Sequence, residues 1–343
     1  MTNPMWNKEE RRLRAGWRLL LAAVFLFVMM QVGSAALPAL IALALWIGGG
    51  RAAETDIETL TDSVNEVLFS SAPLVILQRV ASVAALVLAI ALAGRLLDRR
   101  RFRDFGFRFN RGWWADFGFG LALGAALMAL IFVVEWAAGW VSVTGLYRYS
   151  YEVFWVPMLT GLLLFLGVGV QEELITRGYL LRNLAEGLNF RPIGARGALL
   201  LAYLGSSAVF GLLHLGNPNA TWVSTVNIMI AGLFLGLGYV LTGELAIPIG
   251  LHITWNYFQG YVFGFPVSGM QSAASLFNIQ QGGPALWTGG AFGPEAGLIG
   301  LAAIVLGSLL TVGWVRWRRG RAALDLGLAA YPHAAERTEH ETV

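Results

Sequence analysis

The chain has 343 residues, of which 57% are hydrophobic and 13% charged, and its formal net charge is +3. Soluble globular domains carry roughly 25% charged residues, so this composition argues against a soluble fold. The absence of cysteine excludes disulfides, a thiol nucleophile, cysteine-ligated zinc and palmitoylation. Lys8 is the single lysine, and the arginines cluster beside apolar segments, so no nucleic-acid partner is expected.

Runs of about 20 apolar residues recur along the chain, and each is long enough to cross a bilayer as a helix. We therefore predict an all-α, polytopic integral membrane helical bundle with about eight transmembrane helices. The first run continues to about Gly48, so we expect a retained anchor rather than a cleaved leader. The expected spans are 15–46, 73–95, 114–140, 156–185, 198–219, 222–242, 245–264 and 295–315.

Arginine distribution sets the expected topology, because cytoplasmic segments of membrane proteins are enriched in Lys and Arg. Arginines are dense before the first span, between the second and third, and after the last, which places both termini in the cytoplasm. Segment 99–113 is expected at the headgroups or as a plain loop, and 265–294 as an extramembrane or partly re-entrant connection. Three parts follow: N-terminal helices with the Arg-rich segment (1–150), a core (151–265), and a loop, last span and polar tail (266–343).

Ionisable side chains inside apolar runs are costly and usually functional. Three expected spans carry them in short motifs, with pairs four residues apart that share a helix face. The motif residues are Glu172, Glu173 and Arg177 in QEELITR, Phe210 and His214 in FGLLH, and His252 and Asn256 in HITWN.

The spacing divides the two glutamates, which are adjacent and about 100° apart around a helix. Glu173 is expected to pair with Arg177, while Glu172 faces a cavity with His214, His252 and Asn256. The predicted spans place these groups at unequal depths, and a shared site requires them near mid-membrane. Glu135, in the third span, could be a second functional acid or lie at the lipid interface, and the interface is favoured. His333 and His340 lie in the polar tail, where no catalytic role is expected.

Such a set can hydrolyse an amide bond in two ways. In the first, Glu172 deprotonates a water that His214 orients, while His252 and Asn256 donate hydrogen bonds to the oxyanion. In the second, Glu172, His214 and His252 bind zinc, which activates its own water. The metal-free version is favoured, because zinc binding by Glu172 would occupy the best candidate base.

The three motifs, in this order on successive spans, resemble the CPBP family over roughly 155–265. This family comprises type II CAAX prenyl endopeptidases, bacteriocin-processing and immunity proteins, and the Abi membrane proteins. The resemblance implies an intramembrane endopeptidase of a bacterial plasma membrane that cuts a membrane-associated or lipidated protein or peptide. It implies that Glu172, His214, His252 and Asn256 line the cavity and that Glu173 and Arg177 support it. Phe210 is expected to pack, and Thr176 stands where a bulky residue is common.

Two other functions are compatible with the sequence. A bacteriocin-immunity factor or partner scaffold could use the same fold without catalysis. A proton-coupled transporter could use Glu135, Glu172 and the histidines as a relay, but the sequence has no paired inverted repeat of the kind expected for that class. Membrane lipid is an expected partner in each case, and a protein or peptide substrate is expected for the endopeptidase.

Overall fold

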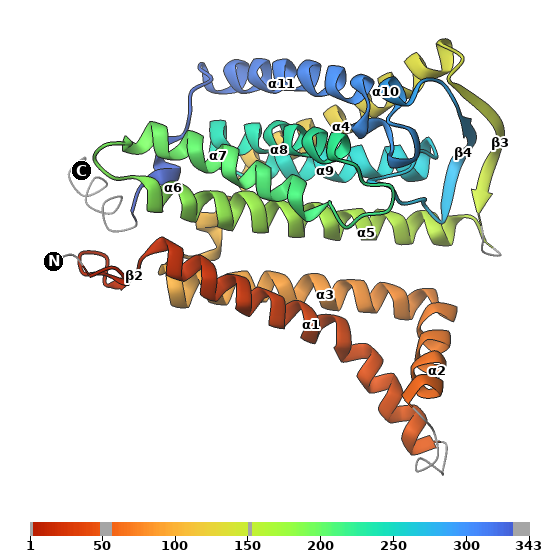
Figure 1. The fold of residues 1–343 in the computed structure, drawn as a ribbon, viewed down its shortest axis with the longest axis horizontal. Helices are drawn as coiled ribbons and strands as arrows, with labels where there is room; N and C mark the ends of the chain where they lie inside the picture. The colour runs from red at the N-terminus through yellow and green to blue at the C-terminus, as the bar shows by residue number, and fades with distance from the viewer. Residues whose placement is uncertain (1–2, 49–56, 150–152, 332–343) are drawn as a thin grey trace.

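The computed structural model describes residues 3–48, 57–149 and 153–331, and most of them are helical (Figure 1). Seven helices in this part of the chain are long and apolar enough to cross a membrane, which confirms an all-α polytopic membrane fold. The helices are α1 (Ala15–Gly48), α2 (Ile57–Ser70), α3 (Ala72–Ala93), α4 (Arg111–Ala137), α5 (Trp155–Glu173), α6 (Arg182–Leu188), α7 (Gly194–Leu213), α8 (Trp222–Thr242), α9 (Ala246–Tyr257), α10 (Ala285–Thr288) and α11 (Leu298–Arg319).

Two groups of helices lie side by side. Helices α1, α2 and α3 form one group, and the remaining helices form the other, with α3 running along α5 (Figure 1). Helix α9 lies at the centre of the larger group, in contact with α4, α5 and α8. This arrangement buries nine of the twelve residues of α9. The helix that carries His252 is therefore surrounded by protein rather than by lipid.

Glycines let α4 and α9 approach closely. A Cβ on Gly124 would lie 2.5 Å from the carbonyl oxygen of Leu251, and one on Gly120 would lie 2.5 Å from that of Ile247. From the other side, a Cβ on Gly250 would lie 2.4 Å from the carbonyl oxygen of Phe117. Gly120 and Gly124 form the small-x-x-x-small pattern that brings membrane helices into backbone contact. The position of α9 thus depends on the absence of side chains at this interface.

Several predicted boundaries need correction. The expected span 245–264 is the 12-residue helix α9, continued by a π-helical turn, Phe258–Val262. The expected span 156–185 is a continuous helix from α5 through a π-helical segment, Leu174–Leu181, into α6. Helix α7 ends at Leu213 instead of 219, so His214 lies just beyond it. Helix α2 was not predicted.

Two small sheets complete the fold. Strand β3 (Val141–Tyr149) pairs antiparallel with β4 (Ala274–Gln281), and β1 (Trp6–Asn7) pairs with β2 (Arg12–Leu13). The segment 265–294, expected as an extramembrane or partly re-entrant connection, contributes strand β4, which lies at one end of the molecule (Figure 1). Segment 99–113, expected at the headgroups or as a plain loop, packs against the protein in part, as the buried side chains of Phe105 and Phe107 show. His333 and His340 lie outside the described residues.

Candidate active site

Two adjacent glutamates at the end of α5 have different environments. The Glu173 side chain is fully buried, whereas the Glu172 side chain is 35% exposed. One Glu172 oxygen, Oε2, is nevertheless buried without a hydrogen-bond partner. Directly after them the helix widens into the π-helical segment that begins at Leu174, a distortion found frequently at functional sites. Glu172 thus offers an unpaired oxygen beside a cluster of buried polar groups.

Glu173 and Arg177 form the ion pair that their spacing predicts. Arg177 Nη1 lies 2.9 Å from Glu173 Oε1 and also donates to Thr176 Oγ1 at 2.8 Å. Arg177 Nη2 donates to the carbonyl oxygen of Gly232 on α8 at 2.8 Å. The hydroxyl of Thr176 in turn donates to the carbonyl oxygen of Glu172. Thr176, where a bulky residue is common in the family, here links the arginine to the backbone of Glu172.

His252 contacts both glutamates. Its Nδ1 lies 2.8 Å from Glu173 Oε1, and its Nε2 lies 3.8 Å from Glu172 Oε2. A carboxylate only accepts, so the Nδ1 proton belongs to His252 and Nε2 is directed at Glu172. The four-residue spacing predicts only the pairing of Glu173 with Arg177. Glu173 and His252 are 79 positions apart in the chain, so no spacing rule relates them.

Phe210 connects the two histidines and the arginine. The ring centroids of Phe210 and His214 are 4.9 Å apart, and those of Phe210 and His252 are 6.1 Å apart. The Arg177 guanidinium lies 4.4 Å from the Phe210 ring centroid, a geometry that attracts a cation to the ring face. His214 Nδ1 lies 2.8 Å from the Phe210 carbonyl oxygen, so Nδ1 donates and Nε2 is left for another partner.

The predicted residues converge only in part. Glu172, Glu173, Arg177 and His252 form one connected group, and Phe210 brings His214 next to it. Among the described residues, however, His214 forms no ion pair or hydrogen bond with Glu172 or His252. Asn256, one turn beyond His252, is partly exposed, and its amide bonds to no described residue. Its donor and acceptor are both available to a bound molecule.

The alternative reaction requires zinc at Glu172, His214 and His252. Within the described ranges, no group of three or more His, Asp or Glu side chains is placed to hold a metal ion. Glu172, His214 and His252 are therefore not grouped as metal ligands in this part of the chain.

Glu135 was placed wrongly by the sequence analysis. Its side chain is fully buried, not at the lipid interface, and Gln281 Nε2 on β4 donates to its Oε2 at 3.3 Å. The partner comes from a strand that was not predicted. Glu135 ties the end of α4 to this sheet and does not contact the candidate site.

Comparison with known proteins agrees with the motif residues. Residues 153–258 match the family model described as type II CAAX prenyl endopeptidase Rce1-like. No curated protein and no solved structure matches the chain significantly. The matched segment contains every residue of the three motifs, from Glu172 to Asn256. The chain is thus an integral membrane protein whose residues 153–258 match the Rce1-like family model of type II CAAX prenyl endopeptidases.

Proposed function

We propose that the protein is an intramembrane endopeptidase that hydrolyses a peptide bond in a membrane-associated or lipidated protein or peptide. The observation that carries this proposal is the arrangement of His252 between two glutamates, with Nδ1 bonded to buried Glu173 and Nε2 directed at the unpaired oxygen of Glu172. A histidine oriented by one carboxylate next to a second, accessible carboxylate is suited to proton transfer. The Rce1-like match supports the same activity.

In the proposed mechanism, Glu172 is the general base. The 3.8 Å between Glu172 Oε2 and His252 Nε2 is too long for a direct hydrogen bond and suits a water that contacts both atoms. Glu172 takes a proton from this water as its oxygen attacks the substrate carbonyl. The same proton then passes to the departing amine, so Glu172 ends each cycle as a carboxylate.

Hydrogen bonds to the oxyanion complete the mechanism. Asn256 Nδ2 is the first donor, because its amide has no partner among the described residues. His252 Nε2 donates as well when the ring carries protons on both nitrogens. His214 keeps Nε2 available to orient the water, which requires it to approach Glu172 when substrate binds. Catalytic hydrogen bonds often tighten in this way. The proposed mechanism contains no metal step.

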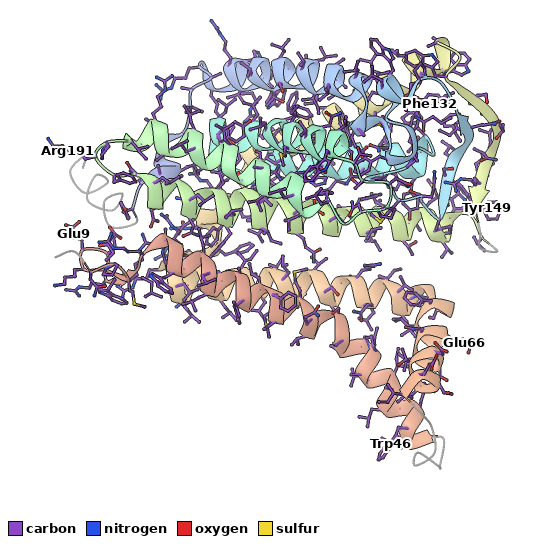
Figure 2. All side chains as sticks on the ribbon, viewed as in Figure 1. Glu9, Trp46, Glu66, Phe132, Tyr149 and Arg191 are labelled. Carbon is purple, nitrogen blue, oxygen red and sulfur yellow. The ribbon has the colours of Figure 1, made fainter. Side chains whose placement is uncertain are left out.

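A comparison of membrane proteins in cells tests the activity. Cells producing the wild type or Glu172→Ala are compared for membrane proteins and peptides that accumulate uncut in the variant. Glu66→Ala is the matched control, because Glu66 is an exposed glutamate on α2, in the other group of helices (Figure 2). Accumulation in Glu172→Ala but not in Glu66→Ala is expected. The accumulated peptide is then incubated with purified protein in liposomes, and zinc is measured in the same preparation.

The outcomes separate catalysis from a binding role. Cleavage of the reconstituted peptide by the wild type at sub-stoichiometric zinc supports the metal-free endopeptidase. Cleavage that requires one zinc per chain would show that zinc, and not Glu172, activates the water. The Glu172→Ala, His252→Ala double variant is also tested in a strain that lacks the gene. Full complementation of the deletion by this variant would instead support a non-enzymatic immunity or scaffold protein.

A further inference from the structure

The two halves of the candidate site lie on separate segments of the chain. His214 lies at the end of α7, and His252 and Asn256 lie on α9. Phe210 on α7 packs against His252. His214 itself lies beyond the end of α7, so its position also depends on what holds the loop that follows it. Segment 264–270 follows the π-helical turn at the end of α9. It bonds both to the loop after His214 and to Gln259 in that turn.

On one side, this segment holds the loop that follows His214. Asn217 Nδ2 donates to the carbonyl oxygen of Ser268 at 3.1 Å, and Asn219 Nδ2 donates to that of Gly269 at 3.3 Å. The two backbones also approach closely. Gly269 has φ +83°, and a Cβ there would lie 1.7 Å from the carbonyl oxygen of Pro218. Only glycine fits this contact.

On the other side, the same segment is fixed to the end of α9. Gln259, three residues beyond Asn256, is fully buried, and its Nε2 donates to the carbonyl oxygen of Pro266 at 2.6 Å. The backbone N–H of Phe265 donates to the carbonyl oxygen of Gln259 at 2.9 Å. The segment is thus anchored to α9 through one side chain and one backbone bond.

Glu295, in the short helical turn before α11, joins these two anchors. Its Oε1 accepts from the backbone N–H of Ser268 at 2.5 Å and from Ser268 Oγ at 3.1 Å, and its Oε2 accepts from Gln259 Nε2. Glu295 is only 4% exposed. Ser268 has φ +48°, an uncommon conformation for a residue other than glycine. Two bonds to one carboxylate hold Ser268 in that conformation.

We propose that Glu295 is a positioning residue that sets the distance between His214 and the α9 pair His252 and Asn256. Glu295 does so by bonding both Gln259 and Ser268. The loop after His214 is in turn bonded to the backbone carbonyls of Ser268 and Gly269. The geometric part of this proposal is independent of the reaction, and its catalytic part rests on the proposed function.

The geometric part is tested by distances between spin labels. The chain has no cysteine, so each introduced cysteine is a unique labelling site. Leu215→Cys labels the His214 loop, and Val133→Cys labels α4, which packs along α9; both side chains are exposed. The distance distribution of this pair is expected to shift and broaden in Glu295→Ala. The pair Leu204→Cys and Val133→Cys, with one label on the body of α7, is expected not to change.

Glu135→Ala is the matched control, since Glu135 is also a buried glutamate bonded to a glutamine, away from the His214 loop. It should leave the Leu215–Val133 distribution unchanged. If Glu295→Ala does not fold, the Asn217→Ala, Asn219→Ala double variant releases the other side of the segment and should broaden the same distribution. An unchanged distribution in whichever of these variants folds would overturn the proposal, whatever the activity.

The catalytic part is tested on the peptide that accumulates in Glu172→Ala cells. A displacement of about 1 Å can cost roughly 10²-fold in rate, so Glu295→Ala is expected to lower kcat by about tenfold to a hundredfold with little change in KM. Glu295→Gln keeps a carbonyl acceptor for Ser268 and should recover part of kcat. A rise in KM alone would contradict positioning. If the wild type cleaves nothing, the proposed function fails while the distance measurement still decides the geometry.

Discussion

Arg177 is fully buried beside the candidate site, and its charge is balanced by one carboxylate. Glu173 lies 2.9 Å away, a carbonyl oxygen of α8 accepts a second bond, and the Phe210 ring covers one face. Removing one partner of a buried ion pair leaves the other charge uncompensated, which is far more costly than losing an exposed pair. This pair should therefore control local stability as well as the orientation of His252.

We expect Arg177→Gln to lower the free energy of unfolding by about 3–5 kcal/mol. Arg103→Gln is the matched control, since Arg103 is 67% exposed and lies 3.9 Å from Asp104. That variant should change stability by about 1 kcal/mol or less. Reversible unfolding in mixed micelles measures both. Equal losses of unfolding free energy in the two variants would show that the buried Glu173–Arg177 pair stabilises the protein no more than an exposed pair does.

Contacts of single residues were predictable where both partners lie within about one helical turn of each other in the chain. The four-residue spacing predicts Glu173 with Arg177 and Phe210 with His214, and both contacts are present. The bond from His252 to Glu173 was not predictable, because it depends on how α9 packs against α5. The roles assigned to Glu172, His214, His252 and Asn256 stay predictions.

At the scale of elements, the interface between α4 and α9 decides where His252 and Asn256 lie. Within a bilayer, helices associate through close packing, since lipid tails are as apolar as the side chains. Here the packing is backbone against backbone at Gly120, Gly124 and Gly250. The same helix also contains Gly118, where a Cβ would meet nothing within 4 Å. One helix thus offers both a critical and a neutral glycine.

We expect Gly124→Ala to displace α9 and to destabilise the protein, because the new Cβ would lie 2.4 Å from Thr254 Oγ1 and 2.5 Å from a backbone oxygen. Overpacking of this kind typically costs about 1–3 kcal/mol. Gly118→Ala should be neutral or slightly stabilising, since alanine favours helix. Thermal unfolding in micelles measures both variants. A stable Gly124→Ala protein would mean that α4 and α9 can separate without loss.

The long helices were predictable, whereas the short elements were not. Apolar length alone located most spans, with α8 matching its predicted limits of 222–242. The strand pairing of β3 with β4 joins segments more than a hundred residues apart and has no local signal. Helix α9 was predicted too long, because its apolar sequence reflects burial by other helices and not a full crossing of the membrane.

For the whole molecule, a single carboxylate joins the two groups of helices. Glu186 on α6 is almost fully buried and accepts from Arg12 at 2.6 Å, Arg18 at 2.5 Å and Arg100 at 2.7 Å. Arg18 also bonds to Asp98. Burial lowers the pKa of Arg100 to about 10, which leaves it charged at neutral pH. These residues come from the N-terminal arm, α1, the segment after α3, and α6.

This cluster should matter more than the apolar contacts between α3 and α5, because the bilayer gives those contacts little hydrophobic driving force. We expect Glu186→Gln to leave three buried guanidinium groups without a full counter-charge. The free energy of unfolding should fall by about 3–5 kcal/mol. The loss should appear where the two groups meet. Hydrogen exchange in nanodiscs is expected to rise in α1 and α3 while α8 and α9 keep their protection.

Glu58→Gln is the control for this prediction, since Glu58 is an exposed glutamate on α2. It should leave exchange unchanged throughout the chain. A uniform rise in Glu186→Gln would mean that the molecule unfolds as one unit, and no rise would mean that apolar packing alone holds the groups together. A rise confined to α1 and α3 would show that the N-terminal helices can loosen while the centre that carries His252 stays folded.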